Sequence, residues 1–262
     1  ANEIGLKGFE RNEMEVRVKS SVGAAVAPVY SSTTTLIVTP YLAEPEWPVI
    51  YLVGAAAENE WDNSKATPFF RSETDPFVYT LTSNLKAGDF KLLGVLGKWG
   101  PAWGMDTKTN DTSAKLKFRP SESDPDVPNI SGLIPADGYY TITVSLRDLT
   151  VTVTPYGAAT GATTYAAMGV VGAFTDWGGK PDVALTKSTK NPHLWNGTIT
   201  LASDTELKFR ANSNWDNNWG AGADPASWYG KGSSGSANLK VAAGTYKVQF
   251  NDLTAEYVLI EQ

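Results

Sequence analysis

The chain repeats itself at long range, and tryptophan marks the repeat. Each member of one set of tryptophans is followed 116 residues later by its counterpart in a second set: Trp61, Trp99 and Trp103 by Trp177, Trp215 and Trp219. KWGPAWG at 98–104 also returns as NWDNNWG at 214–220. A period this long does not fit a solenoid unit, so it predicts two copies of one complete domain.

Composition narrows the class of ligand. The chain has 262 residues, and its 28 acidic against 22 basic side chains give a net charge of −6. This balance disfavours nucleic acids, because few cations are present to displace counterions from phosphates. The nine Trp, eleven Tyr and nine Phe suit a ligand with flat, weakly apolar faces, and sugar rings are such ligands. The chain has no Cys, which excludes disulfides, thiolate metal sites and a Cys nucleophile.

No targeting or membrane segment is visible in the sequence. It contains no apolar run of about 18 residues and no signal peptide. The chain begins at Ala1 rather than at Met, which leads us to expect a processed or trimmed fragment.

The hydrophobic pattern predicts an all-β protein. MEVRVKS (14–20) alternates as a half-buried strand does, and TTLIVTPY (34–41), VIYLVG (49–54), FVYTLT (77–82) and ELKFRAN (206–212) also fit strands. Helical periodicity is not convincing anywhere. Many short strands between Gly-, Pro- and Asn-containing turns predict tandem immunoglobulin-like β-sandwiches.

Three segments follow from this pattern. Residues 1–44 are expected to be the C-terminal remnant of an immunoglobulin- or fibronectin-like β-domain with a Pro-rich linker. Residues 45–156 are expected to form the first carbohydrate-binding β-sandwich and residues 164–262 the second, with GAATGA (157–162) as a flexible joint.

The repeated tryptophans lie beside repeated cations. In ELKFRAN, Leu207 and Phe209 face one way, whereas Lys208 and Arg210 face the other. Lys91 occupies the position of Lys208 in the first copy. Two exposed indole rings with a cation between them can support two successive sugar faces, and stacking contributes about 1–3 kcal/mol per ring. Each site alone would bind weakly, so two sites on one chain indicate avidity for a polymer.

The candidate carbohydrate-binding residues are Trp61, Lys91, Trp99 and Trp103 in the first copy and Trp177, Lys208, Arg210, Trp215 and Trp219 in the second. The first and third tryptophan of each copy are preferred as ligand contacts over the middle one. Tyr79 and Trp195, which also keep the repeat spacing, are assigned to the core, and Trp47 to packing between domains. Trp228 has no counterpart in the first copy and fits either the rim of the second site or a packing role.

The motif ELKFRANSNWDNNWG (206–220), together with VTPY at 38–41 and 153–156, resembles the SusE/SusF family of starch-binding surface lipoproteins of Bacteroidetes. The resemblance implies tandem carbohydrate-binding domains that capture starch or a related α-glucan at the outer-membrane surface, without catalysis or a cofactor. It implies other outer-membrane glycan-uptake proteins as partners, and a lipid anchor on an N-terminal Cys that this chain lacks.

The family uses a pair of aromatic residues with a basic residue between them. The resemblance carries this set onto Trp177, Arg210 or Lys208, and Trp219 in the second copy, and onto Trp61, Lys91 and Trp103 in the first. The first copy departs from the pattern at Leu93 and at the Gly-Pro-Ala of 100–102.

Other functions are weighed against glycan binding. A glycoside hydrolase needs two carboxylates, but only Glu60 and its counterpart Asp176 lie at matching positions near the aromatics. The single histidine, His193, is assigned a structural role. A calcium-dependent adhesion module could use the scattered carboxylates of Asp106, Asp111, Asp124, Asp126 and Asp216. A different polysaccharide, or a scaffolding role in an outer-membrane complex, stays open.

Overall fold

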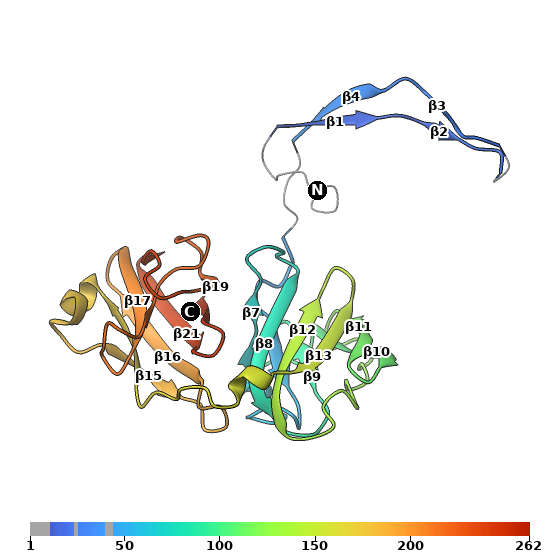
Figure 1. Cartoon of the computed structure of the whole chain (residues 1–262). Coiled ribbons are helices and arrows are strands. Elements are labelled where there is room, and N and C mark those ends of the chain that lie inside the picture. The colour runs from blue at the N-terminus through green and yellow to red at the C-terminus, as the bar shows by residue number, and fades with distance from the viewer. Residues whose placement is uncertain (1–10, 24–25, 40–43) are drawn as a thin grey trace. The chain divides into compact units, whose positions relative to one another are not determined.

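The computed structural model describes residues 11–23, 26–39 and 44–262 (Figure 1). The chain divides into two compact units, residues 1–44 and 45–262. No helix among the described residues is long and apolar enough to cross a membrane.

The first unit contains two short antiparallel ladders. Strand β1 (Asn12–Val16) pairs with β4 (Thr34–Val38), and β2 (Lys19–Ser20) pairs with β3 (Val29–Tyr30). The prediction that residues 14–20 form a half-buried strand is wrong, since Val18 is 71% exposed. Alternation is present, but no second sheet of the described residues covers the apolar face. The end of the predicted strand at 34–41 lies outside the described residues.

The first repeat forms one continuous antiparallel sheet of nine strands. In chain order these are β5 (Tyr51–Val53), β6 (Thr67–Pro68), β7 (Phe70–Arg71), β8 (Val78–Leu85), β9 (Lys91–Leu93), β10 (Ala102–Asn110), β11 (Ser113–Arg119), β12 (Gly138–Ser145) and β13 (Thr150–Pro155). Their spatial order is β6-β5-β9-β10-β11-β13-β12-β8-β7. A single turn of 3-10 helix, η2 (Asn63–Lys65), follows β5.

The second repeat builds a second antiparallel sheet, again from short strands. They are β14 (Met168–Gly172), β15 (Val183–Lys187), β16 (Leu194–Leu201), β17 (Thr205–Ala211), β18 (Asn218–Trp219), β19 (Tyr229–Lys231), β20 (Leu239–Val241), β21 (Gly244–Asn251) and β22 (Glu256–Glu261). The order is β18-β17-β14-β15-β16-β21-β22-β19, and β20 pairs with β17. The 3-10 segment η3 (Gly157–Ala159) lies between the repeats, and η4 (Ala173–Gly178) follows β14.

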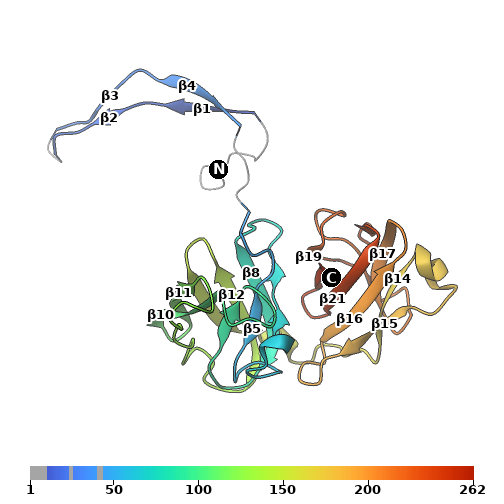
Figure 2. The same cartoon turned by 180° about the vertical axis from the view of Figure 1, so that it is seen from behind.

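The observed architecture confirms the predicted all-β class with antiparallel sandwiches (Figures 1 and 2). Tyr79 and Trp195 are 0% and 1% exposed, as the alternation of their strands predicts. The Tyr79 hydroxyl donates to the carbonyl of Trp47 at 2.7 Å. The Trp47 ring packs edge-on against Trp103 at 5.0 Å, so it fills the first repeat instead of joining two domains.

The two repeats meet along an interface with buried polar contacts, which we call the seam. The Asn251 side chain donates to the carbonyl of Thr82 at 2.8 Å, and the Gln249 side chain donates to the carbonyl of Pro68 at 2.8 Å. Trp228 packs against the cores of both repeats. Its position favours the packing role over the rim of a site.

Candidate functional site

Each repeat presents one pair of solvent-facing indole rings. The ring centres of Trp61 and Trp99 are 6.5 Å apart with planes tilted by 37°. Those of Trp177 and Trp215 are 6.3 Å apart, also tilted by 37°. Trp61, Trp99 and Trp215 are 37%, 37% and 43% exposed, and Trp177 is half-buried. We call these pairs the first and second platform.

The expected pairing of the first and third tryptophans is therefore wrong in the first repeat. Trp103 is 2% exposed and lies against Trp47 and Phe118. It sits in β10 opposite Phe118 of β11, on the face that points into the core, so no ligand can stack on it. Its counterpart Trp219 is half-buried against Phe250, with ring centres 5.2 Å apart.

The two tryptophans and the glycine of the repeated Trp-x-x-x-Trp-Gly motif thus have three different roles. Its first tryptophan forms the platform, and its second anchors the loop in the core. The glycine permits close backbone approach, because a Cβ on Gly104 would lie 2.0 Å from the carbonyl oxygen of Pro128. On Gly220 it would lie 2.1 Å from that of Ala237. Packing alone therefore explains the second tryptophan and the glycine of the motif.

A buried ion pair supports the second platform. The Arg210 guanidinium lies 4.7 Å from the ring centre of Trp215, and only 5% of the residue is exposed. Its Nε and Nη2 donate to the Asp182 carboxylate at 2.8 and 2.7 Å in a bidentate pair. Every hydrogen bond from Arg210 to a described residue leaves from these two nitrogens, so Nη1 stays available as a donor beside the platform.

The loop before Trp177 holds an unusual backbone conformation. Asp176 and Trp177 have φ values of 50° and 51°, and Gly178 has 104°. Left-handed conformations of non-glycine residues cost free energy and gather at functional sites. The buried Thr175 holds the start of the loop, since its hydroxyl bonds both the amide and the carbonyl of Gly172 at 3.0 Å. The first copy keeps one such residue, Glu60, with φ 50°.

The two equivalent lysines fasten loops instead of facing a ligand. Lys91 and Lys208 do point away from the cores, but Lys91 is 6% exposed and donates to Asp126 at 2.7 Å. Lys208 donates to the carbonyl of Ser236 at 2.8 Å and to the side-chain oxygen of Asn218 at 3.2 Å. Each therefore ties the segment after the tryptophan motif to its strand. The hydrogen bond from Lys91 is the main reason that the pKa of Asp126 lies below its usual value.

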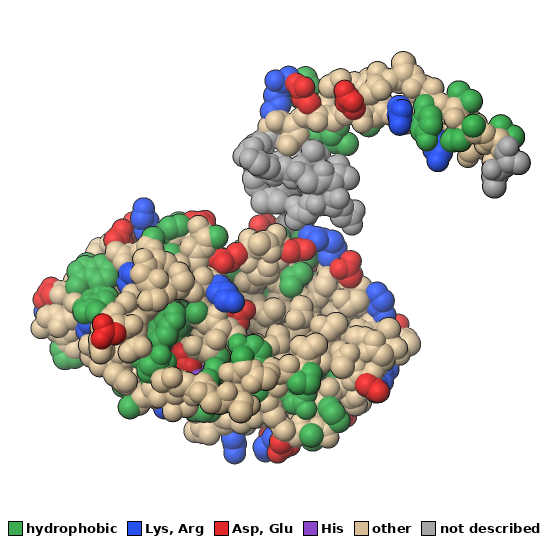
Figure 3. Space-filling view, in the orientation of Figure 1, with side chains coloured by type: hydrophobic (Ala, Val, Ile, Leu, Met, Phe, Trp, Pro, Cys, Tyr) green, Lys and Arg blue, Asp and Glu red, His purple; other side chains and the backbone are tan. Residues whose placement is uncertain are grey.

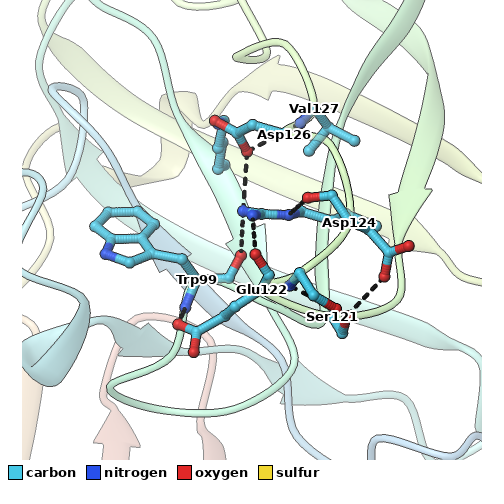
Figure 4. A network of polar contacts seen from close by, with 9 residues as sticks. Trp99, Ser121, Glu122, Asp124, Asp126 and Val127 are labelled. Carbon is cyan, nitrogen blue, oxygen red and sulfur yellow. Dashed lines mark hydrogen bonds and ion pairs between the residues drawn. The ribbon is translucent and has the colours of Figure 1, made fainter.

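A polar network that the sequence did not indicate holds the first platform. Arg119 Nη1 donates to the carbonyl of Trp99 at 3.0 Å, and the Glu122 carboxylate accepts from the Trp99 amide at 2.7 Å. Arg119 also bonds the carbonyls of Glu122 and Asp124 and the carboxylate of Asp126. Figure 4 shows the Trp99 indole pointing away from this network. The only sign of this network in the sequence was the segment 111–128 of the first copy, which is longer than the corresponding segment of the second copy.

The acidic residues and the histidine already have protein partners. Glu60 pairs with Lys86 and Asp176 with Lys180, both at 3.2 Å. His193 is 3% exposed and bonds Asp252 at 2.6 Å, which confirms its structural role. Within the described part of the chain, no group of three or more His, Cys, Asp or Glu is placed to hold a metal ion.

The copies differ on the outer face next to the platform strands. In the second copy Gly169 pairs with Arg210 across β14 and β17. In the first copy Tyr51 pairs with Leu93 across β5 and β9, and both are buried against Trp228 and Ile260 of the second repeat. The supporting arginine of the second platform thus has an apolar replacement in the first.

Comparison with known proteins finds a likeness among solved structures only. No protein-family model matches the chain, and no curated protein matches it. Among solved structures, the crystal structure of SusF from Bacteroides thetaiotaomicron matches with 18% sequence identity and a TM-score of 0.34. The match covers 97% of this chain and 58% of that chain, so this chain spans little more than half the length of that protein.

Proposed function

We propose that the chain is a non-catalytic glycan-binding protein with one binding platform in each repeat. The first site consists of Trp61 and Trp99, and the second of Trp177, Trp215 and the free edge of Arg210. The observation that carries the proposal is the recurrence of the same indole pair, with the same 37° tilt, in both repeats. Core packing does not require this pair, because separate residues fill both cores.

The electrostatics favour an uncharged ligand. Asp182 neutralises Arg210, and together they are almost fully buried, with side-chain exposures of 7% and 6%. A phosphate or sulfate would meet little net positive charge at either platform. On the face drawn in Figure 3, basic side chains are scattered among acidic ones and form no continuous patch. Vicinal hydroxyls of a sugar can accept from Arg210 Nη1 while the ring stacks on an indole.

The class of glycan comes from the sequence resemblance. Likeness of residues 206–220 to the SusE/SusF motif makes starch or a related α-glucan the proposed ligand, and the outer-membrane surface the proposed location. A tilted indole pair suits a curved glycan better than a flat one. Other glycan-uptake proteins of that membrane are the proposed partners, and a purely scaffolding role is the alternative. A hydrolase is disfavoured because it needs two carboxylates across the bond, whereas the repeated positions beside each platform supply one, Glu60 or Asp176.

Retention in a starch-containing native gel tests the proposal. We expect retention to weaken in the first-platform double variant (Trp61→Ala with Trp99→Ala) and in the second-platform double variant (Trp177→Ala with Trp215→Ala). The quadruple variant should migrate as in a gel without polysaccharide, because stacking supplies most of the affinity. Unchanged retention of the quadruple variant would refute the assignment.

Tyr30→Ala is the matched control. It removes a ring that is 43% exposed in the first compact unit and should leave retention unchanged. Parallel gels with pullulan, dextran, xylan and levan identify the glycan. If xylan or levan retains the protein and starch does not, that glycan replaces the α-glucan as the proposed ligand. If no polysaccharide retains it, the scaffolding role is favoured.

A further inference from the structure

A cavity of about 780 Å³ lies between the repeats, on one side of the seam. This is within the size range of small-molecule sites. Its walls come from η2 and the turn after β9 in the first repeat, and from β15, β16 and β21 in the second. A smaller cavity of about 360 Å³ adjoins it and shares Thr186, Asn196 and Gln249. We call the two together the cleft.

The second repeat contributes a contiguous polar surface to the cleft. Thr186 is paired with Asn196 across β15 and β16, and Asn196 with Gln249 across β16 and β21. Thr198 is paired with Lys247 one step further along the same two strands. Alternate residues of a strand share a face, so all five side chains point out of the core into the cleft.

These polar groups lack intramolecular partners among the described residues. No hydrogen bond or ion pair joins the side chains of Thr186, Asn196, Thr198 or Lys247 to another residue in the parts of the chain that the structure describes. The side-chain oxygen of Gln249 is buried and also accepts no hydrogen bond from a described residue. Thr186, Thr198 and Lys247 are exposed, where water can satisfy them. A buried polar atom is normally satisfied, so the unpartnered Gln249 oxygen favours a bound polar molecule.

The first repeat supplies the opposite wall from the loops of the first platform. Ser64 and Lys65 follow Trp61 closely in η2, and Leu96 closely precedes Trp99. The amide of Gly97 donates to the carbonyl of Asn63 at 2.9 Å, which joins the two loops. The buried ring of Tyr51, the residue that replaces Gly169 of the second copy, completes this wall.

We infer that the cleft is a third glycan-binding site, which receives sugar units of a chain that is also held on the first platform. The wall has an aromatic ring, and the floor offers hydroxyl, amide and ammonium groups without protein partners, as a neutral hydroxyl-rich ligand requires. In the second repeat the counterpart surface beside the platform carries Gly169 and the Arg210–Asp182 pair instead of Tyr51 and Leu93. This inference rests on the proposed function and adds to it a preference of the first platform for longer glycan chains.

Calorimetric titration with maltotriose and maltoheptaose tests the inference in the second-platform double variant, where only the first platform and the cleft remain. We expect maltoheptaose to bind more tightly than maltotriose. Replacing Asn196→Leu and Lys247→Met should weaken maltoheptaose binding about fivefold and leave maltotriose binding unchanged, because only the longer sugar reaches the cleft. The control pair Lys115→Met and Thr152→Val likewise replaces one lysine and one neutral polar residue by apolar ones, on exposed positions of β11 and β13, and should affect neither sugar.

The outcomes separate this inference from the proposed function. If removing Trp61 and Trp99 abolishes binding but the cleft changes leave the maltoheptaose affinity unaltered, the cleft assignment fails and the platforms stand. Equal weakening of both sugars would also overturn it, because it would indicate a change at the platform. If the unaltered protein binds neither sugar, the α-glucan assignment fails and the cleft inference fails with it. Circular dichroism of each variant checks that the fold is kept.

Discussion

At the scale of single residues, the second platform depends on a glycine that touches its arginine. Gly178 has φ +104°, and a Cβ there would lie 2.7 Å from Nη2 and 3.0 Å from Nη1 of Arg210. The guanidinium cannot move away freely, because Asp182 holds it by two hydrogen bonds and both groups are buried. The chain therefore places Gly directly after Trp177, where the backbone must turn over the arginine.

We expect Gly178→Ala to destabilise the protein by about 1–3 kcal/mol, through backbone strain and displacement of Arg210. It should also weaken maltoheptaose binding at the second platform about tenfold. Urea unfolding and calorimetric titration in the first-platform double variant measure the two effects. Gly161→Ala is the control, since it has φ +77° but nothing within 4 Å, so it should cost stability without affecting the site. Full affinity in Gly178→Ala would show that Arg210 does not act at the platform.

At the scale of elements, alternation and repeat spacing carried most of the fold prediction. They predicted the all-β class and the core positions of Tyr79 and Trp195, because a half-buried strand buries every second residue. They did not distinguish Trp99 from Trp103. Both occur in one Gly- and Pro-containing stretch of sequence, and which ring faces solvent depends on where β10 begins and on its pairing with β11. The roles of Lys91 and Lys208 were missed for a related reason, since their partners lie in segments distant in sequence.

The segment at 111–128 is the element that positions the first platform, and Arg119 is its centre. We expect Arg119→Met to weaken first-platform binding about tenfold, because the backbone of Trp99 loses its fixed position. Titration with maltotriose in the second-platform double variant measures this loss. The same change in the first-platform double variant should leave binding unaltered.

Lys115→Met is the control for this element, since it lies in the same strand, is exposed and should have no effect on binding. The loss of stability in Arg119→Met should be modest, about 1–2 kcal/mol, because water can replace some of the lost hydrogen bonds. A binding loss that is equal in both platform backgrounds would indicate general unfolding and would contradict a positioning role.

At the scale of the whole molecule, the seam fixes one platform relative to the other. Asn251 is 0% exposed and donates to the carbonyl of Thr82, so it joins β21 of one repeat to β8 of the other. Two binding sites on a rigid body raise the effective concentration of a polymer at the second site once the first is occupied. This benefit falls if the repeats move independently, even when each platform is intact.

Asn251→Ala should therefore separate avidity from affinity. Loss of the buried hydrogen bond should cost about 1–3 kcal/mol and lower the melting temperature by several degrees in calorimetry, since the Thr82 carbonyl loses its seam partner. Maltotriose binding should stay unchanged, whereas retention in a starch gel should fall, because only the polymer can span both platforms. Asn84→Ala is the control, since it removes a solvent-exposed hydrogen bond of 2.9 Å to the carbonyl of Lys190 across the same seam. Equal retention of Asn251→Ala and the parent protein would mean that each platform engages the polymer alone.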